Sequence, residues 1–115
     1  LIRLGVDPMR FLREFGHRTH HVHAKDTVFD EEALYLYGRI KPSFDNPAAF
    51  GEGYWRYCIP GEGVADWALI MKRLEDFSYD GILSIEHEDG RYYSSWELEA
   101  EGFIRARAHL KRFMV

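Results

Sequence analysis

Two short segments of the chain alternate between polar and apolar positions, and each gathers its polar residues on one face. In residues 19–26 the polar face holds Thr19, His21, His23 and Lys25, and the apolar face holds Val22 and Ala24. In residues 81–89 the polar face holds Ser84, Glu86 and Glu88, and the apolar face holds Leu83 and Ile85. This alternation predicts two strands, each with one face in the core. Because a polar face is costly to bury unless it binds something, we expect the chemistry there.

Three other stretches have the apolar spacing of amphipathic helices. The first begins at Asp7-Pro8, a capping residue followed by proline, and Gly16 predicts its end. Asp66 caps the second, and the capping-box pattern Ser94-x-x-Glu97 begins the third. The expected apolar stripes are Phe11, Leu12 and Phe15 in the first helix, Trp67, Ile70, Met71, Leu74 and Phe77 in the second, and Trp96, Ala100, Phe103, the stem of Arg107, Leu110 and Met114 in the third.

Between the first strand and the second helix, residues 26–63 show no sustained period. Within this stretch only Glu31 to Tyr37 indicates a helical turn. The remainder is rich in turn-forming and aromatic residues: Pro42, Pro47, Gly51, Gly53, Trp55, Pro60, Gly61 and Gly63. We therefore expect one long loop. Its aromatic content favours a functional loop over a disordered one.

The order of these elements is helix, strand, long loop, helix, strand, helix. Strands that alternate with helices are expected to be parallel and joined by right-handed crossovers. In a parallel barrel, catalytic groups lie at the C-terminal ends of the strands, and four polar residues fall there: His23, Lys25, Glu86 and Glu88. The pattern therefore predicts an α/β fold, with about two parallel strands, flanking helices and one long loop, as part of a (β/α)8 TIM barrel.

Composition narrows the functional classes. The chain has 115 residues, 46% hydrophobic and 30% charged, which is typical of a globular domain. A net charge of −4 argues against nucleic-acid binding, and no apolar run is long enough to cross a membrane. Its single cysteine, Cys58, fits a reducing compartment, so we expect a cytoplasmic protein. The chain begins with Leu1 rather than methionine, so we expect it to be a segment of something longer.

His23 and Glu86 form a candidate metal pair. Neutral imidazole and carboxylate are both ligands for divalent first-row metals, and neighbouring strands would bring the two side chains together. The alternative is a hydrogen-bonded strand histidine and an ion-paired carboxylate. Two ligands do not hold a catalytic metal, which needs three or four protein groups. Any further ligands must therefore come from outside this segment.

Four runs carry a resemblance to a known family. They are His21-Val22-His23-Ala24-Lys25-Asp26, Pro60-Gly61-Glu62-Gly63-Val64-Ala65-Asp66-Trp67, Tyr79-Asp80-Gly81 and Ser84-Ile85-Glu86-His87-Glu88-Asp89. In this order they resemble the sugar phosphate isomerase/epimerase superfamily, which has the xylose isomerase-like barrel. That superfamily includes ketose 3-epimerases, inosose dehydratases and, more distantly, endonuclease IV. The resemblance implies that residues 1–115 are the C-terminal segment of such a barrel domain, with its last two strands.

The resemblance also implies roles for individual residues. His23 would be a metal ligand, and Glu86 would be both a metal ligand and the catalytic acid or base. The metal would be a divalent ion such as manganese, cobalt, magnesium or zinc. The family's other ligands have no matching motif in this sequence. In the ketose epimerases an arginine lies six positions after the histidine ligand, and Phe29 holds that position here.

The implied reaction is proton abstraction next to a carbonyl, by a metal-dependent isomerase or epimerase of a sugar, sugar phosphate or cyclic polyol. His21 and Lys25 would contact substrate oxygens. Trp55 would cover a sugar face and Arg56 would pair with an acidic group, unless both only pack within the loop. An inosose dehydratase-like lyase and an endonuclease IV-like hydrolase are alternatives within the superfamily.

A non-catalytic role also stays open. An unpaired sheet edge would let the segment associate with a second copy of itself or with the rest of a barrel. We expect the isolated segment to be catalytically inactive, because it supplies only two of the implied ligands.

Three further motifs have simpler interpretations. His87 is expected to face the helices, while Glu88 and Asp89 are expected to form a solvated strand end. Gly61-Glu62-Gly63 favours a tight loop before the Asp66 cap over a phosphate-binding turn.

Overall fold

The computed structural model describes residues 1–40 and 49–114. Its helices are α1 (Pro8–Phe15), α2 (Glu31–Tyr37), α3 (Trp67–Asp76) and α4 (Trp96–Lys111), with 3-10 turns at Ile2–Leu4, Gly16–Arg18 and Gly90–Tyr92. Its strands are β1 (Val22–Ala24), β2 (Asp26–Phe29), β3 (Gly51–Glu52), β4 (Trp55–Cys58) and β5 (Leu83–Ile85). Within the described ranges, no helix is both long and apolar enough to cross a membrane.

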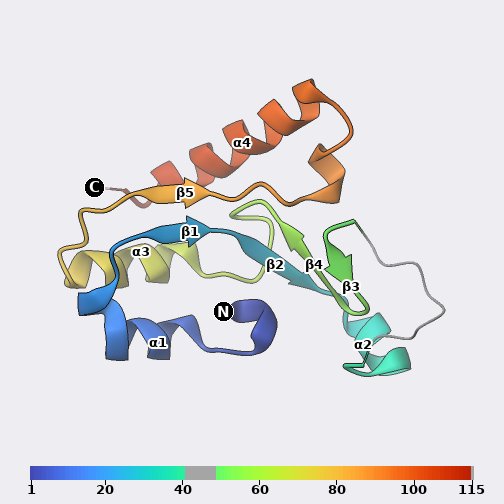
Figure 1. Ribbon diagram of the computed structural model, residues 1–115, viewed down its shortest axis with the longest axis horizontal. Coiled ribbons are helices and arrows are strands. Elements are labelled where there is room, and N and C mark those ends of the chain that lie inside the picture. The colour runs from blue at the N-terminus through green and yellow to red at the C-terminus, as the bar shows by residue number, and fades with distance from the viewer. Residues whose placement is uncertain (41–48, 115) are drawn as a thin grey trace.

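The two strands expected from the alternating pattern form a parallel pair. β1 and β5 pair with Val22 opposite Leu83 and Ala24 opposite Ile85. Both strands are shorter than the sequence suggests, and residues 16–18 form a 3-10 turn before β1. α4 lies along β5, and α1 and α3 lie together beyond β1 (Figure 1). The architecture is therefore α/β, with parallel strands flanked by helices, as predicted.

Local capping signals place the first and third helices. The Asp7 carboxylate accepts a hydrogen bond from the Met9 backbone N–H at 2.8 Å, and Gly16 follows the last residue of α1. The Asp66 carboxylate accepts one from the Leu69 N–H at 2.9 Å and begins α3. In both helices a short polar side chain satisfies an N–H group that has no partner inside the helix.

The hydrophobic core lies between the parallel pair and its helices. Its buried members are Leu12, Ala24, Trp67, Ile70, Leu74 and Leu110. Val22, Leu83 and Ile85 pack against them, so the apolar face predicted for each strand is the core face. The stripe predicted for α3 is confirmed at its buried positions. In α1, Leu12 is buried but Phe11 and Phe15 remain partly exposed.

The predicted stripe of α4 is confirmed at Leu110 but is wrong at Trp96 and Phe103. The buried positions are Gly102, Ala106 and Leu110, whereas Trp96 is 82% exposed and Phe103 is 44% exposed. The helix turns its small residues inward because it lies very close to the β5 side. A Cβ atom at Gly102 would collide with the imidazole of His87, which faces the helix as expected. The cap is also one residue later than predicted, since Ser95 accepts the hydrogen bond from Leu98.

The expected long loop contains a second sheet. β2 pairs antiparallel with β4, and β4 pairs antiparallel with β3. In the β2–β4 pair Asp26 lies opposite Cys58, and Phe29 lies opposite Trp55. Only Lys25 separates the end of β1 from the start of β2. α2 is the helical turn predicted over the same residues. Pro42 and Pro47, which contributed to the loop prediction, lie outside the described residues.

Candidate functional site

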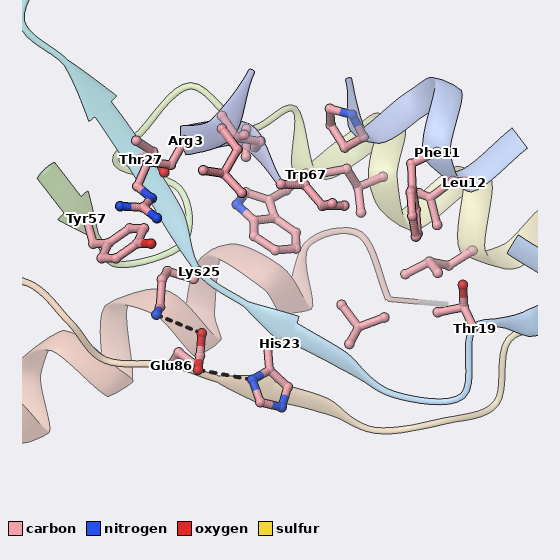
Figure 2. A pocket seen from close by; sticks show the side chains of 18 of the residues that line it. Arg3, Phe11, Leu12, Thr19, His23, Lys25, Thr27, Tyr57, Trp67 and Glu86 are labelled. Atoms are coloured by element: carbon pink, nitrogen blue, oxygen red, sulfur yellow. Dashed lines mark ion pairs between the residues drawn. The ribbon is translucent and has the colours of Figure 1, made fainter. Parts of the chain in front are cut away.

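Three polar side chains at the C-terminal ends of β1 and β5 converge on one another. His23 Nδ1 lies 3.0 Å from Glu86 Oε1, and Lys25 Nζ lies 2.9 Å from Glu86 Oε2 (Figure 2). Lys25 also forms an ion pair with Glu88 at 3.1 Å. The parallel register and the two-residue repeat of each strand produce this arrangement. The prediction that the two polar faces meet is confirmed.

His21 extends the same polar face toward the N-terminal end of β1. Its Nε2 atom lies 3.0 Å from the hydroxyl oxygen of Ser84. Its ring also meets the ring of His23 edge to face, with centroids 4.9 Å apart. His21 is therefore held in place by one contact from each strand, and it lines the same pocket as His23.

The charged groups keep one another ionised. Burial lowers the pKa of Lys25, but hydrogen bonds to Glu86 and Glu88 outweigh burial and raise that pKa above its ordinary value. The Lys25 ammonium, helped by His23, holds the pKa of Glu86 below its ordinary value against the opposing effect of burial. At neutral pH Glu86 is thus a carboxylate, the form that coordinates metals. Lys25 is a cation suited to stabilising negative charge rather than to releasing a proton.

The polar face opens into a pocket of about 500 Å³. Figure 2 shows His23, Lys25 and Glu86 on one side of it, and Phe11, Leu12 and Trp67 on the other. Within the described residues β1 pairs only with β5. The lining of the pocket also includes residues of α1 and α3, so one opening reaches both the polar face and part of the core.

β4 contributes differently from the prediction. Tyr57 lines the pocket, with its ring centroid 4.3 Å from Lys25 Nζ. Trp55 contacts Tyr57, with ring centroids 5.1 Å apart. Neither Trp55 nor Arg56 is among the residues that line the pocket, and the Nη1 atom of Arg56 lies 4.0 Å from a carboxylate oxygen of Asp89. Strand alternation separates Arg56 from its two neighbours, but this signal is readable only once residues 55–58 are recognised as a strand.

Asp26, which follows Lys25, is fully buried. Its carboxylate accepts hydrogen bonds from the Trp67 indole N–H at 3.0 Å and from the backbone N–H groups of Thr27, Gly61 and Ala65 at 2.9–3.1 Å. A Cβ atom at Gly63 would collide with this carboxylate, so the glycine allows the loop to approach. The tight loop predicted before α3 is therefore held in place by the first residue of β2.

Asp89, which follows Glu88, corrects the prediction of a solvated strand end. It is fully buried, and it accepts hydrogen bonds from the Ile59 N–H at 3.1 Å and from Arg91. Burial opposes ionisation, but the bonds from Arg91 and Ile59 hold the pKa of Asp89 below its ordinary value. Asp26 and Asp89 thus bind Gly61 and Ile59 in one short turn, which connects the start of β2 to the segment that follows β5.

Cys58 lies next to this turn and is fully buried. Burial and the negative charges of Asp26 and Asp89 raise its pKa to about 12. Its thiol therefore stays protonated at neutral pH, which is unsuited to nucleophilic or metal chemistry.

The donor set fits part of a divalent metal site. His23 and Glu86 offer one imidazole nitrogen and one carboxylate only 3.0 Å apart, and both line the pocket. Across residues 1–40 and 49–114, no group of three or more His, Cys, Asp or Glu side chains is placed to hold a metal ion. The described residues therefore match two ligands of such a site.

Comparison with known proteins places this geometry in a family. The sequence profile of the xylose isomerase-like TIM barrel matches residues 4–113. The chain belongs to this family. Its parallel strands and flanking helices are therefore part of a TIM-barrel architecture, as the resemblance of the four motifs implied.

Individual relatives are identical to the chain at just under a third of the aligned positions. An inosose dehydratase of Clostridium perfringens is 31% identical over 111 residues, which are 96% of this chain and 34% of the relative. An inosose dehydratase of Clostridium tetani is 31% identical over 111 residues, covering 94% and 35%. The uncharacterised protein YfiH of Bacillus subtilis is 29% identical over 92 residues, covering 77% and 28%. The chain spans about a third of the length of the curated relatives it matches.

Proposed function

We propose that this chain supplies part of the active site of a divalent-metal-dependent enzyme that removes a proton next to the carbonyl of a polyhydroxylated substrate. The observation that carries the proposal is the convergence of His23, Lys25 and Glu86 on one pocket. Two related dehydratases align with nearly the whole chain. We therefore take dehydration, the loss of water after proton removal, as the first candidate reaction.

His23 and Glu86 are the metal ligands in this proposal. The metal, when bound, polarises the substrate carbonyl and stabilises the negative oxygen formed on proton removal. The pKa of Glu86 lies below its ordinary value, so Glu86 is ionised at neutral pH and its carboxylate can both bind the metal and accept the substrate proton. We assign Lys25 to the stabilisation of a negative substrate oxygen, and His21 to a hydrogen bond with a substrate hydroxyl. Tyr57 lines the end of the pocket beside Lys25, and Trp55 packs against Tyr57.

An isomerase or epimerase is the second candidate, because the family is described by its likeness to xylose isomerase. The two reactions share the proton-removal step. They diverge afterwards, when the proton is either returned to carbon or a neighbouring hydroxyl leaves. The residues proposed here serve the shared step.

Two ligands do not hold a catalytic metal. We propose that the remaining ligands come from outside residues 1–115, either from the rest of a barrel or from another copy of the chain. The edge of β1 away from β5 is where such a neighbour would join.

The experiment uses the complete natural polypeptide that contains these residues, its His23→Ala and Glu86→Gln variants, and a His20→Ala control. His20 is exposed and does not line the pocket. Bound manganese, cobalt and zinc are measured by mass spectrometry, and turnover of an inosose is followed by absorbance. Loss of one ligand is expected to weaken metal binding by at least about tenfold, while His20→Ala binds normally. Unchanged metal affinity in both ligand variants would reject the proposal.

A further inference from the structure

Arg3 lies at the end of the pocket where Lys25 and Tyr57 meet. It belongs to the first 3-10 turn, is half-buried, and lines the pocket together with Glu86. Its guanidinium carbon lies 4.5 Å from the ring centroid of Trp55 and 6.0 Å from that of Tyr57. Figure 2 shows the guanidinium beside Tyr57 on the side of the pocket near Lys25. The aromatic pair therefore supports the face of the guanidinium.

The edge of this guanidinium has no carboxylate partner among the described residues, which sets Arg3 apart from the other cations nearby. Lys25 is bound by Glu86 and Glu88, and Arg91 is bound by Asp89 and Glu62. Arg56 is also directed to Asp89. Stacking on an aromatic ring uses the face of a guanidinium and leaves its N–H donors free for a planar oxyanion.

The charges around the pocket also favour Arg3 as the residue that binds an anion. Lys25 already contacts two carboxylates, so its single charge suits the charge that develops on a substrate oxygen better than a second, permanently anionic group. Arg3 instead combines an uncompensated charge with partial desolvation, which strengthens its attraction for an anion. An acidic group held there would keep the rest of a small ligand in the pocket with His23 and Glu86.

We propose that Arg3, supported by Trp55 and Tyr57, binds a carboxylate or phosphate group of the substrate. The substrate is then an acidic sugar or polyol derivative rather than a neutral one. This inference rests on the proposed function and specifies its substrate class. It also moves the recognition of an acidic group from Arg56, where the sequence suggested it, to a residue that no sequence pattern marked.

The test compares three probes with the same six-carbon skeleton: D-glucitol, D-gluconate and D-glucitol 6-phosphate. Their binding to the complete natural polypeptide is measured by titration calorimetry. At least one acid is expected to bind about tenfold more tightly than glucitol, the size expected of a charge-assisted Arg–oxyanion contact. Whichever of the two acids binds more tightly identifies the recognised group as a carboxylate or a phosphate. Equal binding of all three probes, or no binding, would overturn the proposal.

Variants assign the preference to a residue. Arg3→Gln is expected to abolish the preference and leave glucitol binding unchanged, and Arg3→Lys is expected to keep part of it. Arg13→Gln, an exposed arginine on α1, is the matched control. Any direct binding of the anions to a metal is common to all variants and cancels in the comparison. A preference that survives Arg3→Gln, or disappears in Arg56→Gln, would contradict the assignment.

Two further readouts distinguish an anion subsite at Arg3 from a purely structural role of that side chain. If Arg3→Gln lowers the unfolding temperature and weakens all probes equally, Arg3 only packs against Trp55 and the proposal fails. Arg3→Lys, which retains the stacking charge, provides the second check on folding. Metal content is measured in the same samples, so a failed anion preference with normal metal binding rejects the subsite alone. If the unsubstituted polypeptide binds no divalent metal, the proposed function is rejected instead.

Discussion

The pocket face of the parallel strands and the turn behind their ends treat neighbouring charges in opposite ways. Lys25 lines the pocket and pairs with the carboxylates of Glu86 and Glu88. Asp26 and Asp89, which follow Lys25 and Glu88, are fully buried and bind backbone N–H groups, an indole N–H or arginine side chains. Because adjacent strand residues point to opposite sides, one step along the chain separates candidate chemistry from structural support.

The difference teaches how to rank the acidic residues. A carboxylate whose oxygens are fully used by fixed N–H donors stabilises the fold and has no capacity left for a ligand. Glu86 is one-third exposed, and its oxygens contact the side chains of His23 and Lys25 rather than buried backbone N–H groups. It therefore remains available to a metal. Substitutions on the two sides of the strand ends should separate stability from binding.

The largest effect is expected for Asp26→Ala. Removing this carboxylate leaves several buried N–H groups without partners, including the indole N–H of Trp67. We expect a loss of about 3 kcal/mol or more in the free energy of unfolding, measured by urea denaturation of the complete polypeptide. Asp80→Ala, at an exposed position, is the matched control. Equal unfolding midpoints for the two variants would show that the buried contacts contribute nothing.

Asp89→Asn should make the free energy of unfolding less dependent on pH in the acidic range. The pKa of Asp89 is below its ordinary value of 3.8 in the folded chain, so the unfolded chain binds the proton more readily. The stabilisation is complete above 3.8 and is lost as the pH falls through the folded-state pKa. Unfolding free energies measured between about pH 2 and 6 should therefore fall less steeply in the variant. An unchanged slope would contradict this role. Asp80→Asn is the control.

Lys25→Met should act on the pocket more than on the fold. Removing the ammonium takes away the main influence that lowers the pKa of Glu86, so that pKa should rise. We expect only about 1 kcal/mol of destabilisation, because the two carboxylates that remain are partly exposed. Carbon-13 NMR titration of the glutamate carboxyl groups checks the direction. A lower Glu86 pKa in the variant would be the opposite result.

The smallest effect is expected for Glu14→Gln on α1. Glu14 pairs with Arg10 at 2.9 Å, but both side chains are largely exposed. Exposed pairs of this kind contribute less than about 0.5 kcal/mol. Urea denaturation should barely distinguish the variant from the natural protein, which sets the lower end of the scale. A cost approaching that of Asp26→Ala would remove the contrast between buried and exposed carboxylates.

Local signals made the parallel pair and its capping residues predictable. Asp7, Gly16 and Asp66 act within a few residues of their own position, and alternation alone placed His23 and Glu86 on a common face. The second sheet was not predictable in the same way. β2 has only four residues, and its partner β4 begins almost thirty positions later, with no short turn to mark the pairing.

The burial of Asp26 and Asp89 depends on backbone N–H groups of a distant turn, which carry no sequence signal. The inward face of α4 was missed for a related reason. The close approach of His87 selects Gly102, so the largest apolar side chains of that helix are not the buried ones. Arg3 was missed because a single arginine in a short turn forms no pattern.

The shared turn has a consequence for how the chain tolerates change. Ile59 and Gly61 are bound by two carboxylates: Asp89, which lies beyond β5, and Asp26, which begins β2 directly after Lys25. An inserted or deleted residue between Ile59 and Gly61 would displace both Asp26 and Asp89. The segments that carry His23 and Glu86 would then move, and the distance between these two side chains would change. Length variation among natural versions of this protein should therefore avoid residues 59–61.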